Sequence, residues 1–169
     1  MNTLEFNKSK IFHFGKDEDI TRLKRSLAFW KFRDLKIVFT NGCFDILHLG
    51  HIDYLSKAAD LGKILIIGLN TDDSVKRIKG NGRPLNNENA RAITLATFGF
   101  VNAVILFNED TPYELIEIIR PDILVKGGDY EPEKIIGCDI VKETGGEIVT
   151  IGILKGYSTS LLIEKIKLI

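Results

Sequence analysis

Short apolar runs alternate with longer stretches of helical periodicity from Lys36 to the end of the chain. The runs are rich in Ile, Leu and Val and show little polar alternation, so they predict strands that are covered on both faces, as in a parallel sheet. Five strands are expected, at residues 36–40, 64–69, 103–107, 123–125 and 147–151. The pattern therefore predicts an open, Rossmann-like, five-stranded parallel α/β sheet with helices on both faces.

The segments between these runs predict the helices that connect the strands. Residues 49–61 carry apolar side chains on one stripe, and Gly62 marks the end of that helix. Further helices are expected at residues 71–78, 86–98, 112–119 and 158–168, several of them preceded by Thr, Asn or Ser as capping residues. The most flexible connection is residues 79–84, which contain two glycines and a proline.

The first 35 residues have a different character from the rest of the chain. Residues 17–31 predict one charged helix with Ile20, Leu23, Leu27 and Trp30 at core spacing. Because this segment is too short to be a domain, we expect a helical extension at residues 1–35, appended to a single domain at residues 36–169.

Composition and charge limit the classes of partner. The 169 residues are 44% hydrophobic, enough for a sizeable core, and they contain 23 Lys plus Arg against 23 Asp plus Glu. This balance gives no reason to expect nucleic acid or an anionic membrane as a partner. Any function that depends on charge must reside in a local site.

Cysteine usage and the N-terminal sequence bear on the compartment. Cys43 and Cys138 lie far apart and form no CxxC or Cys/His metal pattern, which suits a reducing environment. Residues 1–14 lack the basic and apolar regions of a signal peptide, and no apolar run approaches the length of a membrane span. We therefore expect a cytoplasmic protein.

The segment from Thr40 to His51 is the most informative part of the sequence. It runs from the end of the first predicted strand into the first helix, which is where ligands bind in an open α/β sheet. Gly42 lets the backbone approach a ligand closely, while His48 and His51 are three residues apart and share one helix face. Two imidazoles beside free amides at a helix N-terminus suit a polyphosphate.

Other interpretations of this histidine pair remain open from the residues alone. A His-x-x-His pair also occurs as two ordinary core or surface histidines, and a zinc site would lack a clear third ligand because the remaining histidine is His13. No GxGxxG fingerprint or GxxxxGK[ST] loop is present, which argues against dinucleotide and P-loop sites.

The whole string favours phosphate binding over these alternatives. Asn41-Gly42-Cys43-Phe44-Asp45-x-x-His48-x-Gly50-His51 closely resembles the GxFDxxHxGH signature of the cytidylyltransferase-like nucleotidyltransferases. A second element of that family, GxST[TS], is matched by Gly156-Tyr157-Ser158-Thr159-Ser160 at the start of the last helix. The resemblance covers about residues 36–169.

Within this superfamily, the chain most resembles the adenylyltransferases that act on D-glycero-β-D-manno-heptose 1-phosphate. The resemblance is carried by residues 70–80, by Arg83-Pro84-Leu85-Asn86 leading to Arg91, and by residues 124–130 with the sequence Leu-Val-Lys-Gly-Gly-Asp-Tyr. Glycerol phosphate cytidylyltransferases carry an arginine shortly before the GxST element, whereas this chain has Ile153-Leu154-Lys155 there. That departure argues against the glycerol phosphate enzyme and leaves open which cation serves the phosphates.

The resemblance implies an activity and its partners. It implies transfer of AMP from ATP to the heptose 1-phosphate, giving ADP-heptose and pyrophosphate for bacterial surface glycan (lipopolysaccharide core) synthesis. Mg²⁺ is expected to arrive with the triphosphate without a metal site built from protein ligands, and a homodimer is expected from the family. The alternatives are another base (CTP or GTP), another acceptor (glycerol 3-phosphate or FMN), or a nucleotide-binding module without catalysis.

Site residues follow from the same motifs. We expect catalytic contacts to phosphate from His48, His51, Lys79 and Arg91. We expect nucleotide binding by these histidines together with Asn41, Gly42, Cys43, Phe44, Gly50, Lys126, Gly128, Tyr157, Ser158 and Thr159. The acceptor is expected to meet Asp45, Arg83 and Asp129, with Asp45 also fixing its own loop by hydrogen bonds. Taken singly, Ser158 is more readily explained as an N-cap, Asp129 equally well as a turn residue, and Lys79 and Arg83 as ordinary solvated charges.

Overall fold

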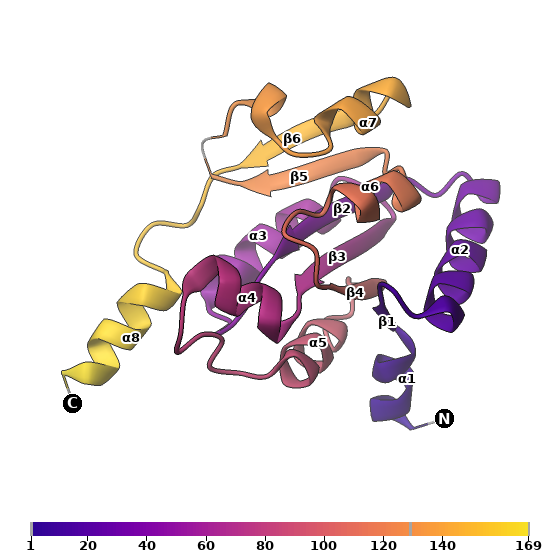
Figure 1. The fold of residues 1–169 in the computed structure, drawn as a ribbon. Helices are drawn as coiled ribbons and strands as arrows, with labels where there is room; N and C mark the ends of the chain where they lie inside the picture. The colour runs from indigo at the N-terminus through magenta and orange to yellow at the C-terminus, as the bar shows by residue number, and fades with distance from the viewer. Residues whose placement is uncertain (1, 129, 169) are drawn as a thin grey trace.

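A computed structural model describes residues 2–128 and 130–168 of the chain. Its centre is one parallel sheet with the strand order β1-β4-β3-β2-β5-β6 (Figure 1). The strands are β1 (Ile11–His13), β2 (Ile37–Gly42), β3 (Ile64–Asn70), β4 (Ala103–Phe107), β5 (Ile123–Gly127) and β6 (Glu147–Ile151). The predicted open parallel α/β fold is confirmed, with six strands in the described residues where the sequence predicted five.

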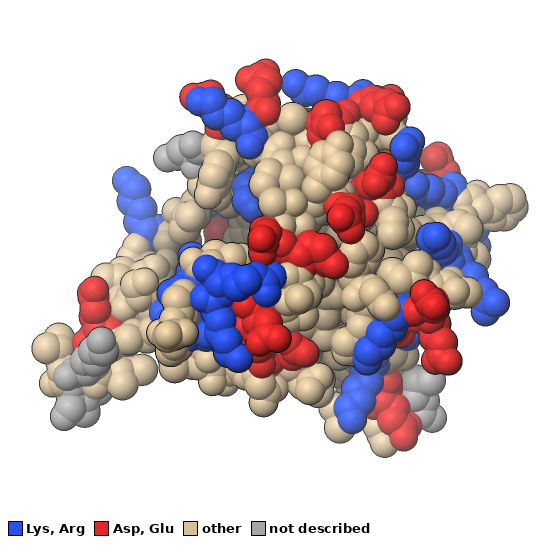
Figure 2. Space-filling view, in the orientation of Figure 1, with Lys and Arg blue, Asp and Glu red and all other residues tan. Residues whose placement is uncertain are grey.

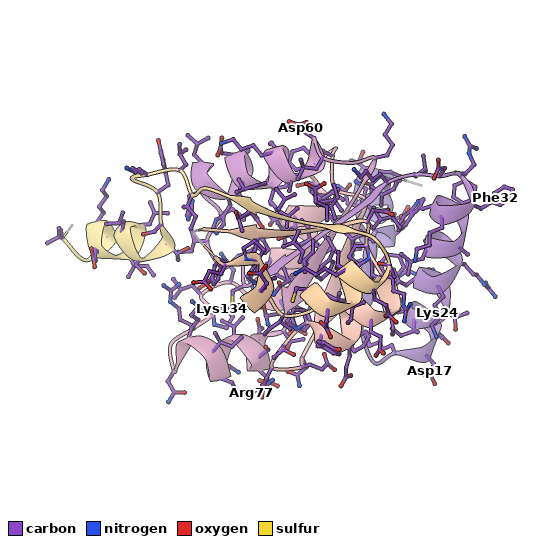
Figure 3. The ribbon with its side chains drawn as sticks, turned by 90° about the horizontal axis from the view of Figure 1, so that it is seen from above. Asp17, Lys24, Phe32, Asp60, Arg77 and Lys134 are labelled. Atoms are coloured by element: carbon purple, nitrogen blue, oxygen red, sulfur yellow. The ribbon has the colours of Figure 1, made fainter. Side chains whose placement is uncertain are left out.

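Helices cover both faces of this sheet. They are α1 (Thr3–Ser9), α2 (Asp17–Phe32), α3 (Leu49–Ala59), α4 (Asp72–Lys79), α5 (Glu88–Ala96), α6 (Tyr113–Ile119), α7 (Cys138–Glu143) and α8 (Thr159–Lys167), with a short 3₁₀ helix, η1, at Pro132–Lys134. Side chains of α2, α6 and α7 pack on one face of the sheet, and those of α3 and α5 pack on the other. Helix α8 projects from the body at the end opposite to α1 and α2 (Figures 1 and 3).

The buried strands explain the two-layered core. All seven residues of β3 are buried, as the continuous apolar run predicted. Successive side chains of a strand point to opposite faces, so Val38 packs with Leu55 on the α3 and α5 face while Phe39 packs with Leu23 on the α2 face. Each face is therefore sealed by its own hydrophobic cluster.

Gly62 has a different role from the helix stop that the sequence predicted. Helix α3 ends at Ala59, two residues earlier than expected. A Cβ atom at Gly62 would lie 2.7 Å from the carbonyl oxygen of Lys36 and 2.6 Å from a methyl group of Val38. A glycine is needed here because the chain enters β3 in close contact with the start of β2.

The N-terminal segment contributes a strand that the sequence analysis missed. β1 joins the edge of the sheet beside β4, with Ile11 aligned to Val104. Phe12 of β1 and Leu23 of α2 belong to the core cluster on the α2 face. The helix predicted at residues 17–31 is present as α2, and the extension contains this strand in addition; its boundary at residue 35 stays a prediction.

The free edge of β1 is capped by side chains of α2. Arg22 donates hydrogen bonds to the carbonyl oxygens of Ser9 and Ile11, and Asp19 accepts one from the amide of His13 at 2.9 Å. Arg22 and Asp19 are themselves paired at 2.8 Å. An exposed strand edge invites pairing with another chain, so these two side chains block edge-to-edge association.

Substituting Arg22→Ala is expected to lower the free energy of unfolding by about 1–2 kcal/mol, because it removes charged hydrogen bonds to two backbone carbonyls, one at the end of α1 and one in β1. Urea unfolding followed by circular dichroism measures this loss. The matched control is Lys24→Ala, a change at an exposed position of the same helix (labelled in Figure 3) that should stay within about 0.5 kcal/mol. Equal losses for the two variants would contradict the capping role of Arg22.

The surface carries both signs of charge. Figure 2 shows acidic and basic side chains interspersed over one face, with a group of Lys and Arg side chains over α4. The basic residues of the last turn of α4 are Lys76, Arg77 and Lys79. Among the residues that the structure describes, no helix combines the length and the apolar character needed to cross a bilayer.

Candidate active site

The sheet changes its winding direction between β2 and β5. From β2 the chain proceeds through β3 and β4 towards one edge, whereas β5 and β6 lie on the other side of β2. The connections that follow β2 and β5 therefore diverge and leave a crevice beyond the carboxyl ends of these two strands. The motif segment that begins at Thr40 lies at this crevice, as the sequence predicted.

Two adjoining pockets occupy the crevice. The loop pocket has a volume of about 510 Å³ and extends towards α4 and the loop after it, with Asn70, Ile78, Arg83 and Asp110 in its wall. The helix pocket has a volume of about 410 Å³ and extends along α3 towards the segment before α8. Both share the residues Asn41, Gly42, Cys43, Phe44, His51, Lys79, Lys126 and Thr159, so the two pockets form one continuous cleft.

The two motif histidines are stacked at the start of α3. Their ring centroids are 3.8 Å apart with an interplanar angle of 23°, and the edge of the Phe44 ring packs on His51 at 5.4 Å. The Nδ1 atoms of both histidines are buried and have no hydrogen-bond partner among the described residues. The predicted placement of both imidazoles on one face is confirmed.

Burial determines the charge of these imidazoles. Burial, with a smaller contribution from the neighbouring His48, lowers the pKa of His51 from 6.5 to about 4. Burial also lowers the pKa of His48. In the absence of an anion, His51 is therefore neutral near pH 7 and carries one N–H donor.

This shift predicts a pH dependence of stability. Between about pH 6.5 and about pH 4 the unfolded chain protonates His51 and the folded chain does not, so protons favour the unfolded state and stability falls as the pH falls. We expect the free energy of unfolding in urea to decline less steeply over this range in His51→Gln than in the wild type. Parallel declines in the two proteins would show that His51 takes up its proton equally in both states.

The first turn of α3 is shaped to receive an anion. His48 is the N-cap residue of this helix and makes no side-chain capping hydrogen bond. A Cβ atom at Gly50 would lie 3.1 Å from both the His48 ring and Cβ of Tyr157, so a glycine lets these groups close around the turn. Free amides and the positive end of the helix dipole favour a negatively charged group at this point.

A lysine on β5 bridges the crevice. Nζ of Lys126 donates a hydrogen bond to Oδ1 of Asn41 at 3.1 Å, which joins the carboxyl ends of β5 and β2. Burial lowers the pKa of Lys126. The ammonium lines both pockets of the cleft, as expected for a residue predicted to bind the nucleotide.

Asp45 and Arg83 form a buried ion pair under the loop that follows α4. Arg83 Nη1 lies 2.6 Å from Asp45 Oδ2, and the other carboxylate oxygen accepts the amides of Leu85 and Asn86 at 2.8 and 3.0 Å. These contacts occupy both oxygens of Asp45. The expected loop-fixing role of Asp45 agrees with this geometry, and its predicted contact with the acceptor stays a prediction.

Arg91 has a structural role that the sequence did not predict. Its side chain is fully buried and lines neither pocket. Its guanidinium donates to the carbonyl oxygens of Asn86 and Cys43 at 3.0 and 2.6 Å and pairs with Asp72 at 2.7 Å. Because every nitrogen of the group has a protein partner, Arg91 holds three segments of the cleft in position, while its predicted contact with phosphate stays a prediction.

The C-terminal motif lies at the helix pocket. Tyr157, Ser158 and Thr159 all line it, and the Ser158 hydroxyl caps α8 by accepting the amide of Leu161 at 3.1 Å. Gly128 lines neither pocket, whereas its neighbour Gly127 lines the helix pocket. Asp129, the predicted sugar-binding residue, lies outside the described residues.

Sequence reasoning missed several residues that shape the cleft. Tyr54 of α3 lines the helix pocket, and its hydroxyl lies 2.6 Å from Oγ1 of Thr40. Burial raises the pKa of Tyr54 to about 12. Asn70 ends β3 and lies in the loop pocket. The position of Asn70 at the carboxyl end of a strand was a signal that could have identified it, whereas Tyr54 looked like one more apolar residue of a helix.

The metal-ligating side chains are dispersed in the described part of the chain. No group of three or more His, Cys, Asp or Glu residues comes together there in a way that could hold a metal ion. Asp110, the second carboxylate beside the loop pocket, is largely exposed and pairs with Arg77 at 2.9 Å.

Comparison with known proteins identifies relatives of this arrangement. The sequence profile of the Cytidylyltransferase-like family matches residues 39–165. "Bifunctional protein HldE" of Campylobacter jejuni is 53% identical over 153 residues, which are 90% of this chain and 31% of that protein. The protein of the same name from Syntrophotalea carbinolica is 45% identical over 170 residues, 98% of this chain and 35% of that protein. The chain thus spans about a third of the length of these relatives.

Solved structures show the same architecture. The crystal structure of the lipopolysaccharide core biosynthesis protein from Thermoplasma volcanium matches with a TM-score of 0.57 and 30% identity, covering 73% of this chain and 99% of that one. Pantoate-beta-alanine ligase from Francisella tularensis, solved with an ATP analogue and beta-alanine, matches with a TM-score of 0.57 over 93% of this chain and 77% of its own. At 14% identity, the second likeness shows the fold alone.

Proposed function

The chain belongs to the cytidylyltransferase-like family, and from this premise we propose that it transfers AMP from ATP to D-glycero-β-D-manno-heptose 1-phosphate and releases pyrophosphate. The product would be ADP-heptose, an activated sugar for bacterial surface glycan synthesis, made in the cytoplasm where ATP is available. The names of the HldE relatives and of the lipopolysaccharide core protein support this pathway. Because the chain spans only part of the HldE relatives, the proposal covers this domain alone.

The observation that carries the proposal is the continuous cleft with the stacked histidines at its centre. His51 lines both pockets at the start of α3, so a group bound there can touch ligands on either side. Lys79 and Lys126 also line both pockets, and Arg83 joins them in the loop pocket. A cleft with this concentration of cations and helix amides suits two phosphorylated ligands.

We assign the nucleotide to the helix pocket. Its walls combine the apolar Ile153 and Tyr54 with Tyr157 and with the backbone at Gly127, which offers a narrow slot for a planar base. A Cβ atom at Gly127 would approach the Tyr54 ring to 3.2 Å, so that wall stays thin only with a glycine. The triphosphate then extends over the first turn of α3 towards His51 and Thr159.

The acceptor would occupy the loop pocket. A phosphate oxygen of the sugar phosphate attacks the α-phosphorus, a new P–O bond forms, and the bond from the α-phosphorus to the β-phosphate oxygen breaks with its electron pair leaving on pyrophosphate. The nucleophile is already anionic near pH 7 and the leaving group needs no proton. Positioning and charge stabilisation therefore supply most of the catalysis.

The protein groups divide this work between them. His48 and His51 donate hydrogen bonds to the phosphates at the start of α3, and an anion held there would raise the low pKa values of both imidazoles. Lys79 contacts the outer phosphates. Mg²⁺ would enter as the counter-ion of ATP, because the two carboxylates that the described residues bring to the cleft, Asp45 and Asp110, are already engaged with arginines.

The first experiment is pyrophosphate release with Mg²⁺, pairing each of ATP, CTP, GTP and UTP with the heptose 1-phosphate, glycerol 3-phosphate and FMN. We expect release with ATP and the heptose 1-phosphate. Release with a different pair would overturn the proposed substrates and keep the reaction class. Nucleotide binding without release from any pair would overturn the enzymatic proposal in favour of a binding module.

We also propose, from the family, that the chain acts as a homodimer. Helix α8 offers a candidate contact surface because Leu161, Ile166 and Leu168 are 43%, 64% and 86% exposed. Light scattering coupled to size-exclusion chromatography measures the mass of the particle, and a monomer at enzyme-assay concentrations would contradict this assignment.

A further inference from the structure

Lys126 stands out among the cations of the cleft because it is held at the junction of the two pockets. It lies on β5, one residue before the strand ends, and it lines both the helix pocket and the loop pocket. Its position beside the point where the sheet changes winding direction places it between the two proposed ligands. The other cation common to both pockets, Lys79, lies on the exposed last turn of α4.

The ammonium of Lys126 is fixed in place and still has donors to offer. One N–H is committed to Oδ1 of Asn41 at 3.1 Å, and an ammonium has three. Among the described residues, Lys126 takes part in no ion pair, and its environment includes the half-buried thiol of Cys43. Within the part of the chain that the structure describes, two N–H donors of this half-buried cation are uncommitted, which suits anionic ligands that arrive from outside.

Charge repulsion is the obstacle that such a group removes. The acceptor phosphate and the α-phosphate are both anionic, and they must approach to bonding distance in the transition state. A cation between them is worth more in a partly desolvated cleft than in water. Its contribution grows as negative charge accumulates on the transferring group.

We propose that Lys126 is a catalytic residue that bridges the acceptor phosphate and the α-phosphate, and so sets the attacking oxygen in line with the leaving pyrophosphate. This inference rests on the proposed function. It assigns Lys126 a contact to both reacting groups, where a residue that only binds the nucleotide would touch one. The Asn41 side chain becomes the group that aims the ammonium at the junction.

Steady-state kinetics and calorimetry separate bridging from simple binding. Lys126→Met keeps the length of the side chain and removes its charge. We expect kcat to fall about 10²-fold or more and KM for the acceptor to rise, while the Kd of a non-hydrolysable ATP analogue changes by about threefold or less. A matched loss in analogue affinity with kcat unchanged would overturn the bridging role and leave a nucleotide contact.

The pH profile provides an independent readout. Burial lowers the pKa of Lys126, so wild-type kcat should decline on the alkaline side as the ammonium loses its proton. In Lys126→Arg the guanidinium stays charged, and the alkaline decline should disappear or move to higher pH even if the variant is slower. An unchanged alkaline decline in the arginine variant would contradict the assignment.

Controls distinguish failure of this inference from failure of the proposed function. Lys63→Met changes an exposed lysine just before β3, at the opposite end of the sheet, and should retain wild-type kinetics. A wild type that releases pyrophosphate beside a fully active Lys126→Met would overturn the bridging role alone. A wild type that is inactive with every substrate pair would overturn the proposed function, and the bridging role with it.

Discussion

Replacing His51 by alanine is expected to lower turnover about 10²-fold or more while the protein stays folded, a loss typical of one preorganised charge-stabilising group. The imidazole lines both pockets, stacks on His48 at 3.8 Å and keeps a buried Nδ1 without a protein partner. Because its contact is proposed to strengthen in the transition state, kcat should fall more than KM rises. Pyrophosphate release under saturating substrates measures the effect.

The control for this result is the remaining histidine of the chain. His13 lies on β1 and pairs with Asp19 at 2.9 Å, far along the sheet from the cleft. His13→Ala should therefore keep turnover within about twofold of the wild type, since it touches no proposed ligand. Circular dichroism and urea unfolding establish that both variants are folded. Near-normal turnover in a folded His51→Ala protein would contradict the catalytic assignment.

Replacing Arg91 by alanine is expected to destabilise the fold by about 3 kcal/mol or more, because it breaks a buried ion pair and strips two carbonyl groups of their donor. The guanidinium ties Asp72 at the start of α4 to Cys43 in the motif loop and to Asn86 before α5. Activity should fall as well, since these three segments form the walls of the cleft. Urea unfolding gives the stability loss directly.

An exposed arginine provides the comparison for Arg91. Arg77, labelled in Figure 3, pairs with Asp110 at 2.9 Å, but both side chains are largely solvent-exposed. Arg77→Ala should cost less than about 1 kcal/mol. Arg91→Lys is expected to rescue little, because one ammonium cannot reproduce a planar group that donates in three directions. If Arg91→Ala were as stable as Arg77→Ala, the positioning role would be wrong.

The strands that carry the site were visible in the sequence because they are buried on both faces. The predicted run at residues 103–107 matches β4, which is buried throughout, at both ends; the run at residues 147–151 likewise matches β6, although this edge strand is only partly buried. The strand β1 was not predicted because three residues are too few to show a hydrophobic periodicity. Its extended conformation depends on its pairing with β4, which the sequence does not reveal. Helix α7 has only six residues and was also too short to be recognised from periodicity.

Some features of the site follow from local sequence, and others depend on tertiary contacts. Local sequence determined the motif loop, the stacked histidines one helical turn apart, and the Ser158 cap of α8, since each depends on neighbours within a few residues. Only the tertiary structure decided that Arg91 is buried beneath the cleft and that Lys126 meets Asn41 across it. The sequence does not show whether the charged side chain of residue 91 is exposed to solvent or buried in the core.

Taken by itself, the sequence determined the parallel α/β architecture, the crevice at the end of the first core strand and the family, because these follow from hydrophobic periodicity and from one contiguous motif. The tertiary structure decided which cations line the cleft and which are buried in its walls, and it added the edge strand with its Asp19 and Arg22 cap. The physical reason is that burial and pairing of charged groups arise between segments as distant as residues 41 and 126, and no local pattern encodes that contact.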